Sequence, residues 1–90
     1  MSINLDPAVV AEAVFKARIR ELEEAARAVI GDSEYFTATN LESLTGTPKS
    51  TWRYWASIGQ GPDSHLLGRR RVWARASAIR WLIEQEQAVS

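Results

Sequence analysis

The sequence predicts a mainly α-helical fold with a small β-hairpin wing, that is, a winged helix-turn-helix preceded by a long N-terminal helix. Three observations lead to this expectation. A long stretch without internal glycine or proline follows Asp6-Pro7. Two short segments with helix-start signals come next, and the few residues between them match the spacing of a helix-turn-helix unit. Two extended segments around Gly68 then predict a hairpin.

The composition is that of one globular domain. The chain has 90 residues, of which 46% are hydrophobic and 24% charged. It has no cysteine and a single histidine, His65, which excludes disulfides and both thiolate and histidine-based metal sites. No apolar run reaches the roughly 18 residues that span a bilayer, and a signal-peptide pattern is absent. We therefore expect a soluble protein of a reducing cell interior, without metal or cofactor.

The zero net charge hides a strong asymmetry. Residues 1–46 carry four cations and eight anions, a net charge of −4, whereas residues 47–82 carry seven cations and one anion, a net charge of +6. Residues 83–90 add two anions. Charges segregated in this way generate a local positive field. The basic part also holds all four tryptophans, which is compatible with nucleic-acid binding or with buried aromatics beside solvated arginines.

Residues 6–31 are expected to form an N-terminal helical extension. Asp6 supplies an N-cap, Pro7 suits the first helical position, and Gly31 suits the C-terminal end. Apolar residues recur along this helix at spacings of 4, 3, 4 and 3: Phe15, Ile19, Leu22, Ala26 and Val29. This seam either mediates self-association with another copy, which we favour, or packs along the chain's own domain.

Residues 33–87 are expected to form the helix-turn-helix unit, the hairpin and a last helix. Thr37 is a suitable N-cap for a short helix that ends at Gly46. Thr47-Pro48 then repeats the cap-plus-proline signal and opens a second helix, from Lys49 to about Ser57.

The hairpin is expected to have its tip at Gly68-Arg69-Arg70. The flanking extended segments are Ser64–Leu67 and Arg71–Ala74. The last helix is expected to start near Ser77 and to run to about Gln87.

An ordered set of residues at characteristic spacings carries a family resemblance. The set is Tyr35-Phe36-Thr37, Leu41, Leu44, Gly46, Lys49-Ser50-Thr51, Trp55, Gly59, Gly61-Pro62, Leu67-Gly68-Arg69-Arg70, Trp73, Arg75 and Trp81-Leu82. On these residues, positions 35–82 resemble the small winged-helix DNA-binding domains of phage excisionases and AlpA-type regulators, which are related to the DNA-binding domain of MerR proteins. The chain departs from that family at Thr39-Asn40, where an acidic pair is usual, at Trp52, commonly a branched aliphatic residue, and at Ala78, where an acidic residue is usual.

In that family the second helix of the unit enters the major groove. Trp52 and Trp55 share one face of this helix, so we expect both to pack inward. Their expected neighbours are Tyr35, Leu41 and Leu44. The outward face then presents the candidate DNA contacts Lys49, Ser50, Thr51, Arg53 and Tyr54, beside a helix N-terminus that attracts anions. The alternative for this face is simple solvation.

The hairpin supplies a second set of candidate DNA contacts: Arg69, Arg70 and Arg71. They are expected to contact phosphates or the minor groove, as the family's wing does. The alternative is that they remain solvated and protect an edge strand from aggregation. Arg75 and Arg80 are expected either to add phosphate contacts or to pair with Glu84.

The resemblance implies a DNA-binding accessory protein: a phage-type excisionase, or recombination directionality factor, that binds and bends DNA at attachment sites and directs an integrase toward excision. Implied partners are double-stranded DNA, a phage integrase and further copies in a homo-oligomer or cooperative array, in the cytoplasm of a bacterial host. The alternatives are a small AlpA- or MerR-like transcriptional regulator and a protein-interaction module acting through the N-terminal helix. The sequence holds no set of catalytic residues, so no enzyme activity is expected.

Overall fold

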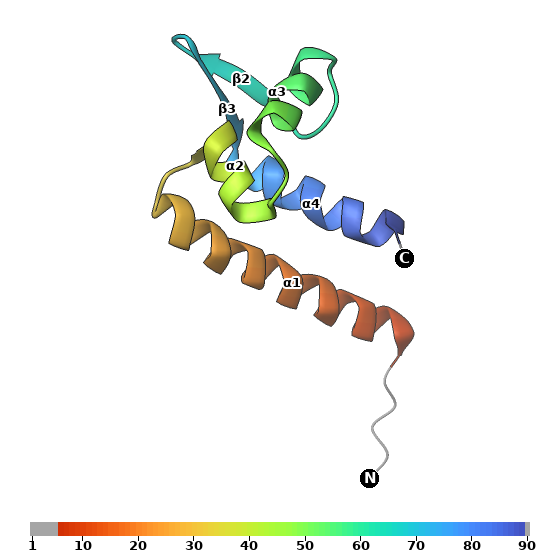
Figure 1. Cartoon of the computed structure of the whole chain (residues 1–90). Coiled ribbons are helices and arrows are strands. Elements are labelled where there is room, and N and C mark those ends of the chain that lie inside the picture. The colour runs from red at the N-terminus through yellow and green to blue at the C-terminus, as the bar shows by residue number, and fades with distance from the viewer. Residues whose placement is uncertain (1–5, 90) are drawn as a thin grey trace.

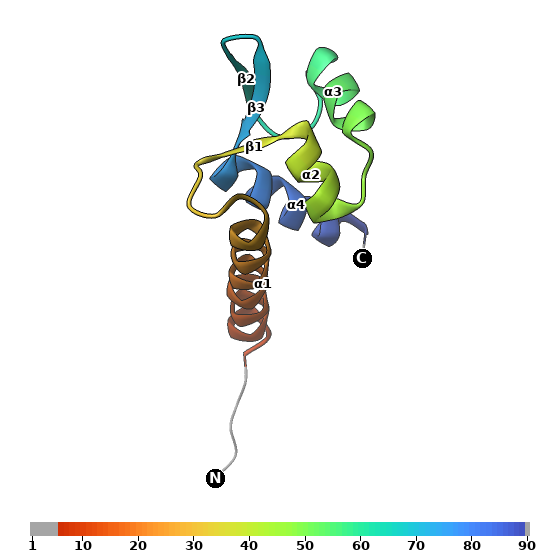
Figure 2. The ribbon, with the colours of Figure 1, turned by 60° about the vertical axis from the view of Figure 1, so that its left-hand side comes forward.

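The computed structural model describes residues 6–89 and is mainly helical, with a small three-stranded antiparallel sheet (Figure 1). The elements follow in the order α1 (Pro7–Ile30), β1 (Tyr35–Thr37), α2 (Ala38–Thr45), α3 (Lys49–Ser57), β2 (Ser64–Leu67), β3 (Arg70–Ala74) and α4 (Arg75–Val89). Helix α1 runs along one side of the molecule beside α4, and α3 and the β2–β3 hairpin lie at the opposite side (Figures 1 and 2). Within the described residues, no helix combines the length and apolarity needed to span a bilayer.

Both ends of α1 lie where the sequence predicts them. The Asp6 carboxylate accepts a hydrogen bond from the Ala8 amide (3.0 Å), and Pro7 occupies the first turn. At the other end the Gly31 amide donates to the Arg27 carbonyl (2.8 Å). Gly31 has a φ of 60°, which glycine adopts without the steric penalty of a side chain. Local cap chemistry therefore fixes the length of α1.

The sheet contains a strand that the sequence does not predict. Strand β1 pairs with β3, so the sheet order is β1-β3-β2, whereas the sequence pattern indicates only an apolar pair at Tyr35-Phe36. The hairpin tip is also shorter than predicted, because β3 begins at Arg70 and only Gly68 and Arg69 form the turn. Gly68 has a φ of 63° and Arg69 has a negative φ, as in the type II′ turns that match the twist of a two-residue hairpin.

Helix α4 begins at Arg75, two residues before the predicted start near Ser77, and ends at Val89 rather than near Gln87. The early start has a structural cause. The Arg75 amide donates to the Glu34 carbonyl (2.8 Å), so a contact from the loop before β1 takes up an amide that has no partner within the helix. No N-cap signal in the sequence marks this boundary, because the amide's partner lies far away along the chain.

All four tryptophans belong to one aromatic cluster. Trp52 is 1% exposed, and its ring lies edge-on to those of Trp55, Trp73 and Trp81 at centroid distances of 5.2, 6.3 and 5.6 Å. Phe36 and Leu41 complete the fully buried centre of the core. The four tryptophans of the basic part are therefore explained by packing.

Tyr35 does not join this cluster, so its predicted contact with the tryptophans was wrong. Its side chain is 37% exposed and packs edge-on against His65 at 5.2 Å. Side chains alternate across a strand, so Tyr35 points to the other face of the sheet from the buried Phe36.

The apolar seam of α1 packs against the chain's own core. Leu22 and Ala26 are buried, and Phe15 and Ile19 are partly buried against the same cluster, with α4 running antiparallel beside them (Figure 1). Val29 is half-buried and faces a hollow beside β1. This arrangement is the second of the two alternatives for the seam. The buried Leu22 and Ala26 leave no surface there for another copy, and self-association of the chain stays a prediction.

A bidentate ion pair joins α1 to α4. The Arg18 guanidinium donates from Nη2 to Glu86 Oε1 (2.6 Å) and from Nε to Glu86 Oε2 (2.9 Å), and its Nη1 donates to Glu21 (2.9 Å). The hydrogen bond from Arg18 holds the pKa of Glu86 below its usual value of 4.5, and the same bond raises the pKa of Arg18. Both side chains are 40–45% exposed, so we expect a contribution to stability of about 1 kcal/mol or less.

This pair predicts a small pH dependence of stability. A carboxylate whose pKa is lower in the folded than in the unfolded chain stabilises the fold fully above about pH 4.5, and this stabilisation is lost as the pH falls through the folded pKa. The melting temperature of the native chain should therefore exceed that of Glu86→Gln at neutral pH and approach it in acid. Thermal unfolding monitored by circular dichroism measures both; a difference that stays constant with pH would contradict the assignment.

Candidate nucleic-acid interface

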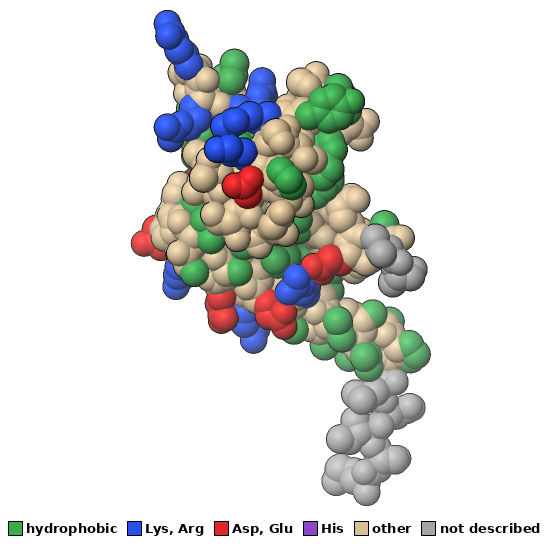
Figure 3. Space-filling view, viewed as in Figure 1, with side chains coloured by type: hydrophobic (Ala, Val, Ile, Leu, Met, Phe, Trp, Pro, Cys, Tyr) green, Lys and Arg blue, Asp and Glu red, His purple; other side chains and the backbone are tan. Residues whose placement is uncertain are grey.

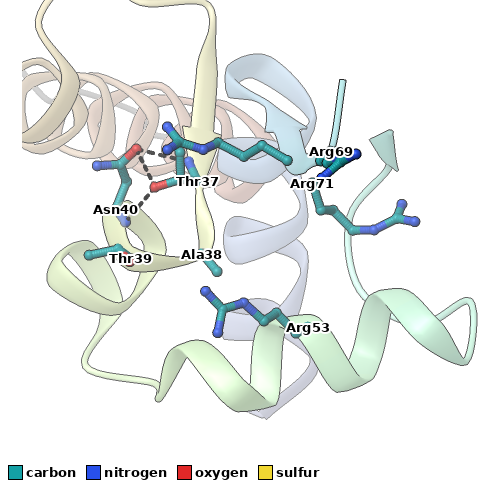
Figure 4. Close-up of a pocket in the computed structure, with 8 residues that line it drawn as sticks. Thr37, Ala38, Thr39, Asn40, Arg53, Arg69 and Arg71 are labelled. Carbon is teal, nitrogen blue, oxygen red and sulfur yellow. Dashed lines mark hydrogen bonds between the residues drawn. The ribbon is translucent and has the colours of Figure 1, made fainter. Parts of the chain in front are cut away.

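A hollow with a volume of about 700 Å³ lies between α2, α3 and the hairpin. It is lined by residues 37–40 at the start of α2, by Arg53 of α3 and by Arg69, Arg70 and Arg71 of the hairpin (Figure 4). No carboxylate is among these lining residues. The structure thus brings predicted residues from the second helix and from the hairpin to one concave site.

The four arginines that line the hollow come from two separate elements. Arg53 points from α3 toward Ala38, and Arg69 and Arg71 lie on the hairpin (Figure 4). Arg53, Arg69 and Arg70 are exposed, whereas Arg71 is half-buried and donates to the Ser64 hydroxyl across the hairpin (3.1 Å). In the part of the chain that the structure describes, none of the four forms an ion pair. Their positive charge therefore remains available to an anionic ligand.

A second hollow adjoins this one, and Thr37 and Asn40 line both. Arg70 lines both, and in the second hollow it lies near Val72, Tyr35 and Leu67. Arg71 lines only the first hollow. Because neighbouring strand residues point to opposite faces, the side chain of Arg71 does not reach the second hollow, where Arg70 and Val72 lie.

The start of α2 is part of the site, although the sequence pattern did not single it out. Thr37 and Asn40 form a capping box: the Asn40 amide donates to Thr37 Oγ1 (3.2 Å), and the Thr37 amide donates to Asn40 Oδ1 (2.8 Å). The sequence did contain a sign that this segment belongs to the site: the chain has Thr39-Asn40 where the resembled family usually has an acidic pair. Neutral residues there leave the rim of the hollow without a negative charge.

The predicted contacts on α3 are mostly accessible, but only one of them lines the hollow. Lys49, Ser50, Arg53 and Tyr54 are exposed and Thr51 is half-buried. Arg53 is the one that the hollow includes. The other four lie along α3 outside it.

The N-terminus of α3 already has an anionic group of the chain beside it. The Lys49 amide donates to Glu42 Oε2 (2.8 Å), so a carboxylate of the chain itself already lies at this helix end. Pro48, at the N-cap position, makes no side-chain cap. The Glu42 side chain of the preceding helix, α2, caps α3 instead.

Arg75 has a structural role, and within the described residues it forms no ion pair with Glu84. Its Nη1 donates to the carbonyls of Gly31 (2.9 Å) and Ser33 (3.1 Å), where α1 ends and the chain turns toward β1. A cation near the C-terminal end of a helix is favourable, because the last carbonyls carry a partial negative charge. Arg75 therefore joins α1 to the start of α4.

The basic side chains gather at one side of the surface. Figure 3 shows Lys and Arg side chains over the hairpin and its surroundings, whereas acidic and basic side chains alternate near α1. The charge asymmetry of the sequence is therefore also an asymmetry in space.

No protein-family model, curated protein or solved structure matches this chain. The resemblance to excisionases consequently depends on the residues of the chain alone.

Proposed function

We propose that this chain binds double-stranded DNA, and that its fold is a winged helix-turn-helix in which α2 and α3 form the helix-turn-helix and the β2–β3 hairpin forms the wing. One observation carries the proposal: four arginines without ion-pair partners among the described residues, from two separate elements, line one hollow that contains no carboxylate. Arginine is suited to such a site because its planar guanidinium pairs with phosphate oxygens and with guanine.

Duplex DNA fits this surface better than a single strand. Proteins that hold single strands stack bases on exposed aromatic rings. Here Trp52 and Trp73 are fully buried and Trp55 and Trp81 are partly buried in the core, while the exposed rings of Tyr35 and Tyr54 are not among the residues that line the arginine hollow. The exposed side of α3, nine residues long, instead offers Lys49, Ser50 and Arg53 to a major groove that admits one α-helix.

For the biological role we propose an accessory protein of site-specific recombination, an excisionase that binds and bends DNA at attachment sites and acts with an integrase in the bacterial cytoplasm. The resemblance of residues 35–82 supports this role. A small transcriptional regulator is the alternative, and the two differ in the location of the DNA site. Footprinting on the DNA that flanks the gene distinguishes tandem sites at an attachment site from a single promoter site.

A protein-interaction module acting through α1 is less well supported. The seam residues Leu22 and Ala26 are buried in the core and are not available to a partner. The large apolar side chains that remain exposed on α1 are Val9, Val10 and Val14, near its first turns.

The dependence of binding on salt tests the proposed function. Each phosphate contact contributes a slope of about −0.9 to log K against log salt, so four arginine contacts predict a slope between about −3 and −4. Affinity for a generic duplex should fall on the order of 10²-fold between about 50 and 200 mM salt. Fluorescence anisotropy with a labelled duplex measures the slope. Absence of duplex binding at low salt, or binding that does not change with salt, would contradict DNA binding through this site.

A further inference from the structure

Glu42 connects the two helices of the proposed DNA-binding unit. Its backbone carbonyl accepts the Gly46 amide (2.8 Å) at the end of α2, and its carboxylate accepts the Lys49 amide (2.8 Å) at the start of α3. The residue thus provides partners for amides on both sides of the turn. Pro48 has no side-chain oxygen with which to cap α3 itself.

The position of this carboxylate has an electrostatic consequence. A helix N-terminus carries about half a positive charge and is a preferred place for a phosphate. On α3 that place is taken by Glu42, whose charge exceeds the partial charge that it meets. Within the described residues no Lys or Arg forms an ion pair with Glu42, so its carboxylate keeps its full negative charge at this helix end, close to the exposed Lys49 and Ser50.

The two helix ends of the unit therefore differ. The start of α2 is capped by the neutral side chains of Thr37 and Asn40 and lines the same hollow as the four arginines. The start of α3 is capped by a carboxylate. An approaching DNA backbone is attracted at the first and repelled at the second.

We propose that Glu42 is a specificity-determining residue: its carboxylate keeps a DNA phosphate away from the start of α3 and so lowers the affinity for non-specific duplex. The inference rests on the proposed function, since it concerns how the same surface selects DNA. Non-specific binding comes almost entirely from phosphate contacts, so a repulsive charge at one potential contact weakens it most. Contacts from α3 to base edges depend less on that charge, which raises the ratio of specific to non-specific affinity.

Glu42→Gln separates the charge from the hydrogen bond. The glutamine side chain retains an oxygen that can accept the Lys49 amide, but it carries no charge. Glu24→Gln is the matched control, because it makes the same change of net charge at an exposed position on α1. We expect Glu42→Gln to bind a random-sequence duplex of about two helical turns on the order of fivefold more tightly, and Glu24→Gln to change affinity by less than about twofold. Equal tightening by both variants, or none by Glu42→Gln, would overturn the proposal.

A third variant excludes an effect of the turn itself. Glu42→Asp keeps the charge but shortens the side chain, so we expect a lower melting temperature without tighter binding. If Glu42→Asp also tightened binding, the effect would come from a loosened α2–α3 turn and not from charge, and the proposal would fail.

Selection from a random duplex library gives the second readout: Glu42→Gln should enrich a weaker consensus than the native chain, and an equally strong consensus counts against the proposal. Failure of the native chain itself to bind duplex would instead refute the proposed function, which distinguishes the two.

Discussion

Replacing Arg53, Arg69 and Arg70 together with alanine should weaken duplex binding by about 10²- to 10³-fold at moderate salt. These three arginines are exposed, line the hollow between α2, α3 and the hairpin, and have no ion-pair partner within the described residues. Their removal therefore deletes DNA contacts without breaking ion pairs inside the protein. Anisotropy titrations should also give a less steep salt slope, by about 0.9 for each phosphate that an arginine no longer neutralises.

The matched control for this variant is a second triple replacement, of Lys16, Arg20 and Arg27 on α1. It makes the same change in net charge at exposed positions. If net charge alone drew the chain to DNA, both variants would lose affinity equally, whereas the interface assignment predicts a loss of less than about threefold for the control. Arg71 is left unchanged in both variants, because its bond to Ser64 also stabilises the hairpin.

Sequence reasoning succeeded where the structure depends on neighbouring residues. Asp6, Gly31, Thr37 and Gly46 act at the helix ends that their chemistry predicts, because each cap partner lies within four residues. Strand β1 was missed because its partner, β3, lies more than thirty residues away along the chain. The start of α4 was misplaced for the same reason, since its first amide bonds to Glu34.

Some features of the candidate site could likewise be predicted from the sequence, and others could not. The three hairpin arginines were selected because they stand together in the sequence without a nearby acid, and Arg53 because it lies on the helix face opposite the inward-facing Trp52 and Trp55. The contact of Glu42 with the Lys49 amide was not predictable, since it depends on the angle at which α2 meets α3. The choice between self-association and internal packing of the α1 seam was likewise open, because a row of apolar residues does not identify what covers it.

The largest effect on stability is expected at Trp52. Trp52→Ala removes the ring that meets three other tryptophans in the core, and we expect it to lower the free energy of unfolding by about 3–5 kcal/mol. A domain has roughly 5–15 kcal/mol in total, so this loss removes a large share of the stability and should shift the unfolding midpoint strongly to lower urea concentration. Urea unfolding followed by circular dichroism measures the decrease. Tyr54→Ala on the same helix, where the side chain is 61% exposed, should change stability by less than about 0.5 kcal/mol.

Trp52→Phe tests what the buried indole contributes beyond its volume. Within the described residues Trp52 Nε1 is buried without a hydrogen-bond partner, a condition that costs about 1–3 kcal/mol. Phenylalanine lacks this N–H and has a smaller ring. The smaller ring makes fewer packing contacts and destabilises the fold, but the removal of an unpaired donor offsets part of that loss. We therefore expect Trp52→Phe to cost about 1–2 kcal/mol, well below Trp52→Ala. Equal instability of the two variants would contradict this expectation. It would mean that the N–H is hydrogen-bonded, for example to a buried water, and that the other three tryptophans pack stably only around a complete indole.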